Sequence, residues 1–247
     1  MSVAFRARRL LLTRRLLMAS SLCLATAVGY ADSATTARAT TAVSTAAASV
    51  ASTATTASIA STATTAPAPD YGFCTVCHGT QGNGNPAIHA PKIAGIQPWY
   101  LKHQLQHFRA RVRGTQPGDV AGMEMQPVAL QLDDQAVDAI AAYVSTFVPQ
   151  APPLTVSGDI KHGRTLYSSC SGCHGPKGEG NSALQAPALA GQTDWYLVTQ
   201  LEHFHEGLRG FSPEDEPGTQ MRAASTVLPD EQAIKDVVAY INTLGRH

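Results

Sequence analysis

The chain has 247 residues with 18 basic and 18 acidic side chains, so its formal net charge is zero. Five arginines and no acidic residue fall within residues 1–31, so the rest of the chain carries 13 basic and 18 acidic side chains, a net charge of −5. Because proteins that bind nucleic acids are basic over the domain that binds, this balance excludes that class of partner.

The first 31 residues have the order of an export signal. A basic start is followed by an uncharged apolar run, Leu16 to Val28, and by small residues that end at Ala31. This order is typical of a secretory signal peptide, so we predict that residues 1–31 are one and that the protein is exported. The alternative is an uncleaved signal that anchors the chain in the membrane, although the apolar run is short for a spanning helix.

Residues 32–69 are almost wholly alanine, threonine and serine and show no apolar periodicity. Such a composition buries too little apolar surface to offset the entropy of ordering the chain. We therefore predict a flexible linker, which would serve as a tether if the signal were retained.

The rest of the chain is a tandem duplication. The motif CTVCHG recurs 96 residues later as CSGCHG, and after a shared glycine the offset becomes 97. We predict two similar domains, domain 1 (70–149) and domain 2 (150–247), joined by a proline-rich connector at 149–153. The matching segments are 74–79 with 170–175, 90–114 with 186–210, and 133–144 with 230–241.

Each domain is predicted to be helical. Apolar residues recur every three to four positions over 101–112 and 197–208, and both runs stop at a glycine, Gly114 and Gly210, as helices often do. The last segment of each domain has the same period and begins with acidic residues that suit a helix dipole. The fold class is therefore all-α. Few apolar residues remain for a core, so a bound group is expected to fill each domain.

The sequence Cys-x-x-Cys-His, found in both domains, is the attachment motif of c-type haem. Two thiols one helical turn apart can form thioethers with the two vinyl groups of a porphyrin, and the histidine then lies beneath the iron. One alternative is a zinc site made from two Cys-x-x-Cys pairs, which leaves both histidines unexplained. Another is a thioredoxin-like motif, which needs a βαβ context that is absent. We predict two covalent haem c groups, bound by Cys74, Cys77 and His78 and by Cys170, Cys173 and His174.

Spacing selects a second ligand for each iron. Met221 is the only methionine after the second motif and lies 47 residues past His174, and the same step from His78 leads to Met125. We predict that Met125 and Met221 bind iron opposite the histidines. Met123 aligns with a threonine, so we predict that it is a loop or haem-contact residue and the fallback ligand.

Two other pairs repeat between the domains. His107 and His203 lie on helical faces beside phenylalanines, which predicts packing or contact with a haem propionate, with iron ligation as the alternative. The Trp-Tyr pairs at 99–100 and 195–196 each begin a helix. Core packing is expected for at least one ring of each pair, and contact with the haem remains open for the other.

Together these features resemble the cytochrome c4 group of dihaem cytochromes. Two fused class I cytochrome c domains carry "CxxCHG", "APxLAGQxxWYLxxQL", a late methionine and a final "LxDxxAxxxVxAYI" segment over roughly residues 70–245. The resemblance implies an all-α fold in which each domain wraps around one covalent haem. The chain departs from this pattern at the start of domain 1, where residues 66–74 replace the helix-like lead-in of domain 2 (158–170).

The resemblance also implies a periplasmic electron carrier with no catalytic residues. Its donor would be a complex such as cytochrome bc, and its acceptor a haem-copper terminal oxidase or a reductase. Histidine–methionine ligation raises the reduction potential and leaves iron no open position, which suits electron transfer. The alternatives are the cytochrome subunit of a periplasmic dehydrogenase, which would keep both sites, and a dihaem peroxidase, which needs a displaceable ligand.

Charge is distributed unevenly between the two domains. Arg109, Arg111 and Arg113 cluster in domain 1, and the acidic run Glu214–Glu216 lies in domain 2. Such runs are usually solvated faces. We hypothesise that the two ends steer different partners by their long-range fields.

Overall fold

The computed structural model describes residues 71–245, so the predicted signal peptide and linker lie outside the described residues. Within 71–245 the regular structure is helical, and the only bridges are two isolated pairs, Asn85 with Ala90 and Asn181 with Ala186. The same part of the chain contains no helix long and apolar enough to cross a membrane. The predicted all-α fold class is confirmed.

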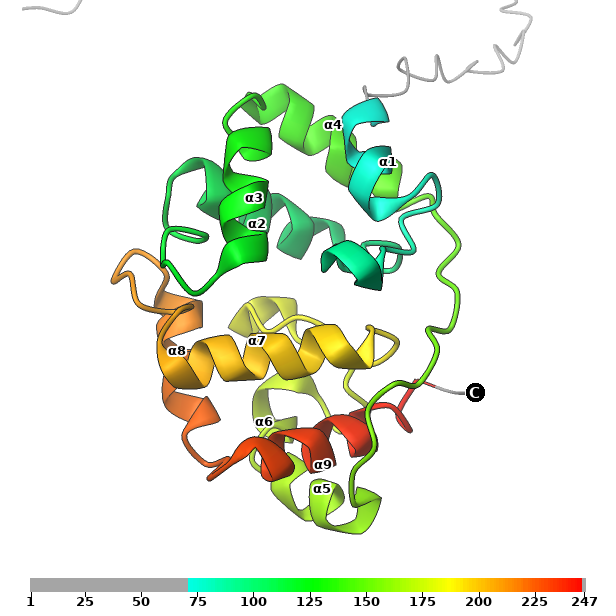
Figure 1. Cartoon of the computed structure of the whole chain (residues 1–247), viewed down its shortest axis with the longest axis vertical. Coiled ribbons are helices and arrows are strands. Elements are labelled where there is room, and N and C mark those ends of the chain that lie inside the picture. The colour runs from blue at the N-terminus through cyan, green and yellow to red at the C-terminus, as the bar shows by residue number, and fades with distance from the viewer. Residues whose placement is uncertain (1–70, 246–247) are drawn as a thin grey trace, which may run out of the picture. The chain divides into compact units, whose positions relative to one another are not determined.

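The helices fall into two groups that correspond to the two repeats (Figure 1). All described residues belong to one compact unit that spans 60–247. Domain 1 contains α1 (Gly72–His78), a 3₁₀ turn η1 (Pro86–Ile88), α2 (Pro98–Arg109), α3 (Val120–Ala129) and α4 (Asp134–Val144). Domain 2 contains α5 (Ile160–Tyr167), α6 (Ser171–His174), η2 (Ser182–Leu184), α7 (Asp194–Glu206), α8 (Glu216–Ser225) and α9 (Glu231–Ile241).

Each domain has its own small apolar core. In domain 1 the core joins Leu101 and Leu105 of α2 to Val137 and Val144 of α4, both of which are fully buried. In domain 2 the corresponding core joins α7 to α9 and adds residues of α5. The apolar period that predicted these helices is therefore the period of their buried faces.

Gly114 and Gly210 do not end the helices, contrary to the prediction. Helix α2 ends at Arg109 and α7 ends at Glu206, where Gly207 (φ 76°) caps it. Gly114 (φ 77°) and Gly210 (φ 69°) instead lie where the following loop crosses the next helix. A Cβ atom there would lie 2.3 Å and 2.2 Å from the carbonyl oxygens of Gly122 and Gly218. These glycines therefore allow a close backbone crossing.

Helices α3 and α8 were missed by the sequence analysis, and the prediction of a loop at Met123 is wrong because Met123 lies on α3. Both helices lack a clear apolar stripe, and α3 contains Pro127. Each begins at an aspartate N-cap. Asp119 and Asp215 both accept a hydrogen bond of 2.9 Å from the backbone N–H of the glycine three residues later. This repeated Asp-x-x-Gly spacing was the available signal for a helix start.

Helices α5 and α9 are neighbours in domain 2 (Figure 1) and pack against each other. A Cβ atom on Gly163 would lie 1.9 Å from the carbonyl oxygen of Asp236, so only glycine fits. The Asp236 carboxylate accepts hydrogen bonds of 2.8 Å from the Asp159 N–H and from Nδ1 of His162. The small Gly163 and the hydrogen bonds to Asp236 thus hold α5, the first helix of domain 2, against α9, its last helix.

Replacing Gly163 with alanine should therefore push α5 away from α9. Because the clash is with backbone, we expect the free energy of unfolding of domain 2 to fall by about 3 kcal/mol or more. Urea unfolding of the holoprotein, followed by far-UV circular dichroism, measures this loss. The matched control is Gly172→Ala, at an exposed position with no atom within 4 Å of the added methyl group. Equal effects of the two substitutions would contradict this account of the α5–α9 contact.

Candidate haem-binding sites

Each predicted proximal histidine is buried and held by one hydrogen bond. His78 and His174 are both 7% exposed. Their Nδ1 atoms lie 2.8 Å from the carbonyl oxygens of Pro91 and Pro187. Because a carbonyl can only accept, Nδ1 carries the proton and Nε2 keeps its lone pair. Burial lowers the pKa of both histidines, and the bond to the carbonyl opposes that shift in part. Both rings are thus neutral imidazoles, the form that binds a metal.

The loop after each motif turns back on itself to bring the proline carbonyl to the histidine. The N–H of Gly84 donates to the carbonyl of His78 (2.9 Å), and Asn85 and Ala90 pair across the turn. Gly84 has φ 80°, and a Cβ atom there would lie 2.6 Å from the nitrogen of Lys92. Domain 2 repeats this geometry at Gly180. The glycines of this loop are therefore required by the fold of the site.

Each motif places two cysteine thiols beside its histidine, and none of the four is in a disulfide. Cys74 and Cys170 are half-buried, whereas Cys77 and Cys173 are exposed. Burial raises the pKa of Cys170. In domain 1 all three motif residues belong to the single helix α1, which fixes the thiols one turn apart. This arrangement fits two thioether bonds to one porphyrin.

A cavity of about 320 Å³ adjoins the motif of domain 2. Cys170, Cys173 and His174 line it, as does Met221 from α8. Its other lining includes the apolar residues Leu189, Leu197, Leu228 and Val237. Thiols, a neutral imidazole and a thioether around an apolar cavity are the donor set of a haem c site, and a pocket of this size suits a cofactor.

The two methionines of α3 differ in burial. Met125 is half-buried and packs against the apolar core of domain 1. Met123 is 47% exposed. The side chain selected by the repeat spacing is therefore the one that faces the interior, and Met123 faces away from it.

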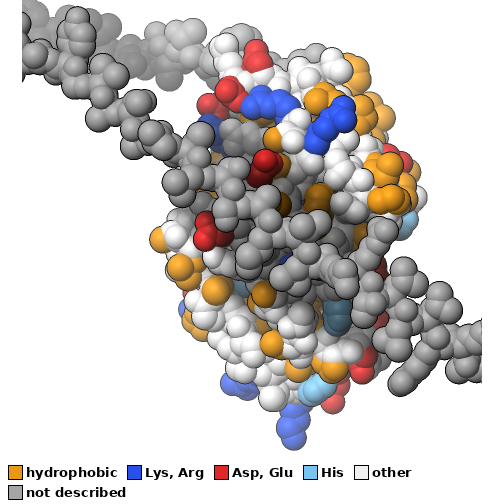
Figure 2. Space-filling model, turned by 90° about the vertical axis from the view of Figure 1, so that its left-hand side faces the viewer, with side chains coloured by type: hydrophobic (Ala, Val, Ile, Leu, Met, Phe, Trp, Pro, Cys, Tyr) orange, Lys and Arg blue, Asp and Glu red, His pale blue; other side chains and the backbone are white. Residues whose placement is uncertain are grey.

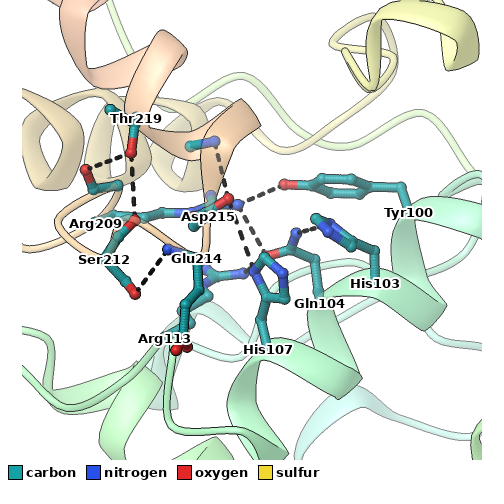
Figure 3. A network of polar contacts seen from close by, with 12 residues as sticks. Tyr100, His103, Gln104, His107, Arg113, Arg209, Ser212, Glu214, Asp215 and Thr219 are labelled. Carbon is teal, nitrogen blue, oxygen red and sulfur yellow. Dashed lines mark hydrogen bonds and ion pairs between the residues drawn. The ribbon is translucent and has the colours of Figure 1, made fainter. Parts of the chain in front are cut away.

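Side chains of the two domains cross at their boundary in a pattern that follows the duplication, and Figure 3 shows the part around Arg209, Tyr100 and Gln104. Arg209 donates to Tyr100 Oη (2.7 Å) and to Gln104 Oε1 (2.9 Å) of domain 1. Arg113 donates to Tyr196 Oη (3.2 Å) and Gln200 Oε1 (2.8 Å) of domain 2. Arg113 also donates to Oε1 of Gln104 (2.6 Å), and Arg209 also donates to Oε1 of Gln200 (2.8 Å). Each glutamine therefore accepts hydrogen bonds from both arginines. The tyrosines of the predicted Trp-Tyr pairs thus hold the domains together.

The buried guanidinium groups of Arg113 and Arg209 also fit an acidic ligand. Each packs over a phenylalanine of its own domain, 4.6 Å and 4.5 Å from the ring centroids of Phe108 and Phe204. Their Nε atoms have no hydrogen-bond partner within 71–245. Arg209 lines the cavity of domain 2, as do Tyr100 and Gln104 of domain 1. Donors at the rim of an apolar cavity match a haem, whose propionates form its acidic edge.

His107 and His203 face carboxylates of the opposite domain. Nδ1 of His107 lies 3.8 Å from Asp215, and Nδ1 of His203 lies 3.5 Å from Asp119. Burial, and then the neighbouring His103, lower the pKa of His107 to about 4. Asp119 and Asp215 cap the two methionine helices. Both histidines are therefore neutral residues of the domain boundary near the start of a methionine helix.

The arginine cluster of domain 1 is not a single solvated face. Arg113 is buried at the domain boundary, and Arg109 donates to the carbonyl of Leu132 (2.9 Å) and forms an ion pair with Asp134. Figure 2 shows acidic and basic side chains in small separate groups on the face that it presents. Domain 1 therefore has fewer solvent-exposed, unpaired arginines to steer a partner than the sequence suggests.

Comparison with known proteins gives the same family for both repeats. The family model "Cytochrome c" matches residues 70–147 and 160–245. Cytochrome c4 of Thiocapsa roseopersicina is 36% identical over 185 residues, which cover 71% of this chain and 88% of that protein. A thiosulfate dehydrogenase electron acceptor of Stutzerimonas stutzeri (strain A1501) is 31% identical over 186 residues, covering 70% and 79%.

A solved structure agrees with these matches. The crystal structure of reduced recombinant cytochrome c4 from Pseudomonas stutzeri superposes with a TM-score of 0.56 and 32% identity, over 70% of this chain and 94% of that one. Cytochrome c domains imply covalently bound haem c, so the predicted cofactor class agrees with the family. The duplicated motifs, the helical fold and these matches together show that the chain belongs to the cytochrome c family, within its two-domain cytochrome c4 group.

Proposed function

We propose that this chain is a dihaem electron carrier that exchanges single electrons with redox proteins in the periplasm. The observation that carries the proposal is the repeated pair of buried histidines, His78 and His174. Each is fixed in its metal-binding tautomer by a proline carbonyl 2.8 Å away and lies beside the two cysteines of its motif. Cys74 and Cys77 would hold one haem, and Cys170 and Cys173 the other.

Met125 and Met221 are the proposed sixth ligands. Met221 lines the cavity that also holds His174, and Met125 packs inward in domain 1. The haem supplies reversible one-electron chemistry when it is bound. The protein's own residues hold the imidazoles neutral, and a histidine with a methionine for each haem would leave no site for a substrate. This favours an electron carrier over a peroxidase.

The family indicates the class of partner, which is other redox proteins. Electron-transfer relatives support redox protein partners, and one of them is named as an electron acceptor of thiosulfate dehydrogenase. We propose that this chain accepts electrons from a periplasmic dehydrogenase or a cytochrome bc complex and delivers them to a terminal oxidase or reductase. Export through residues 1–31 would place it in that compartment.

The mature protein should carry two covalent haems. Mass spectrometry under denaturing conditions should show the mass of the polypeptide plus two haem groups. Cys77→Ala combined with Cys74→Ala should remove one of them, and Cys170→Ala with Cys173→Ala should remove the other. A colourless protein, or a zinc content of one per chain, would overturn the haem assignment.

Substitution of the methionines tests the axial ligands. Met125→Leu should abolish about half of the weak absorption at the red end of the visible spectrum that reports thioether sulfur on ferric iron. It should also lower one of the two reduction potentials, because the sulfur ligand favours ferrous iron. Met221→Leu should do the same for the other haem.

Met123→Leu, two residues away on the same helix, is the matched control and should leave the band and both potentials unchanged. Loss of the band in Met123→Leu, with its retention in Met125→Leu, would reverse the assignment. A redox titration with two moderately high potentials is expected for the wild-type protein.

A further inference from the structure

Lys92 is a buried cation that breaks the twofold pattern of the domain boundary. It follows Pro91, the residue whose carbonyl holds His78, and is only 4% exposed. The matching position in domain 2 is Ala188. Burying an ammonium group is costly unless strong partners replace its water, so a lysine in this place needs a physical reason.

The Lys92 side chain ties three segments together. Its Nζ atom donates to the carbonyl of Gln150 in the connector (2.6 Å) and to the carbonyl of Gly191 in domain 2 (2.8 Å). Its own carbonyl accepts from Nε2 of Gln192 (3.1 Å). The ammonium contacts of Lys92 have no counterpart in domain 2, because the side chain of Ala188 has no donor. The backbone N–H of Ala188 instead donates to Oε1 of Gln97 in domain 1 (2.8 Å).

Just beyond the connector, domain 2 completes the attachment. The buried carboxylate of Asp194 accepts from the N–H and hydroxyl of Thr155 and from the N–H of Val156, at 2.5, 2.7 and 2.8 Å. Lys92 fixes the start of the connector at Gln150, and Asp194 fixes the chain directly after it. The connector is therefore bound to both domains through named hydrogen bonds.

The charge of Lys92 faces neutral acceptors. Both partners of Nζ are main-chain carbonyls, and no ion pair within residues 71–245 includes Lys92. Burial lowers the pKa of Lys92. Lys92 also lines the cavity that contains His174 and Met221. A cation without a carboxylate, in a site shielded from water, raises the electrostatic potential around it more than a surface lysine does.

We propose that Lys92 is a positioning residue that locks the connector and domain 2 onto domain 1 and raises the reduction potential of the haem of domain 2. The inference rests on the proposed function. Oxidised iron carries one more positive charge than reduced iron, so a nearby buried cation favours the reduced state. Ala188 provides no matching charge, so this contribution to the potential has no counterpart in the repeat.

Two substitutions separate the charge from the hydrogen bonds. Lys92→Met keeps an unbranched side chain one atom shorter and removes both the charge and the donor, whereas Lys92→Gln removes the charge and keeps a donor. Lys161→Met, on the exposed face of α5, is the control for loss of one surface charge. Potentials are measured by spectroelectrochemistry in the Met125→Leu background, where the wave of the domain 1 haem is shifted to lower potential and so separates from that of the domain 2 haem. Hydrogen exchange of residues 148–157 is measured on the holoprotein.

Lys92→Met and Lys92→Gln should both lower the domain 2 potential, and Lys161→Met should not. Lys92→Met should speed amide exchange in the connector by about tenfold, the factor for loss of roughly 1.4 kcal/mol of hydrogen bonding, while Lys92→Gln keeps more of the protection. An unchanged potential in both Lys92 variants overturns the electrostatic role, and unchanged exchange in Lys92→Met overturns the locking role. A lowered potential in Lys92→Met alone would show that position, not charge, matters.

Failure of the proposed function would be seen earlier and separately. It would show as absent haem, or as a missing sulfur–iron band, in the wild-type protein. Haem content per chain is therefore recorded for every variant. Lys92→Gln provides the measurement if Lys92→Met does not take up haem.

Discussion

In each domain the buried histidine donates a 2.8 Å hydrogen bond to a proline carbonyl, and the chain between them is folded to make that bond. The loop must turn tightly enough to return the carbonyl within 13 residues of the ring. Glycines with positive φ supply the turn, and the paired residues Asn85 and Ala90 close it. The bond fixes the tautomer and the orientation of the imidazole, which are the two properties that an iron ligand needs. Helix α2 and the methionine helix then pack around a site whose centre is already set.

The two domains complete each other at their boundary. Arg113 and Arg209 each bond a tyrosine and a glutamine of the opposite domain, so removing one domain would leave buried donors and acceptors of the other unpaired. Unpaired buried polar groups cost more than the net value of the bonds that they replace. Residues of domain 1 also line the cavity of domain 2. The two duplicated domains therefore depend on each other's side chains at the boundary and are not two independent domains joined only by a linker.

How far the sequence predicts this protein depends on the kind of signal. The Cys-x-x-Cys-His motif predicted thiols one helical turn apart, which α1 provides for Cys74 and Cys77. The repeat spacing selected Met125 over Met123 as an iron ligand, and Met125 packs inward in the structure. Apolar periodicity predicted α2, α4, α7 and α9, because their buried faces are continuous. It missed α3, whose buried residues are few and whose start depends on an aspartate cap. It also misplaced the ends of α2 and α7, since Gly114 and Gly210 serve a chain crossing that only the tertiary structure creates.

The role of Arg113 shows the limit most clearly. In the sequence it is one of three arginines spaced two apart, as a solvated basic patch would be. In the structure it is buried over Phe108 and bonded across the domain boundary. Nothing local distinguishes it from Arg109, which pairs with a carboxylate at the surface. The repeat distinguishes the two arginines, because Arg113 recurs as Arg209 in domain 2. Arg109 and Arg111 do not recur: the matching residues are a histidine at 205 and a glycine at 207. In a duplicated protein, recurrence thus identifies what both domains require. The positions that fail to recur, Lys92 above all, are where the two sites can differ in potential while sharing one scaffold.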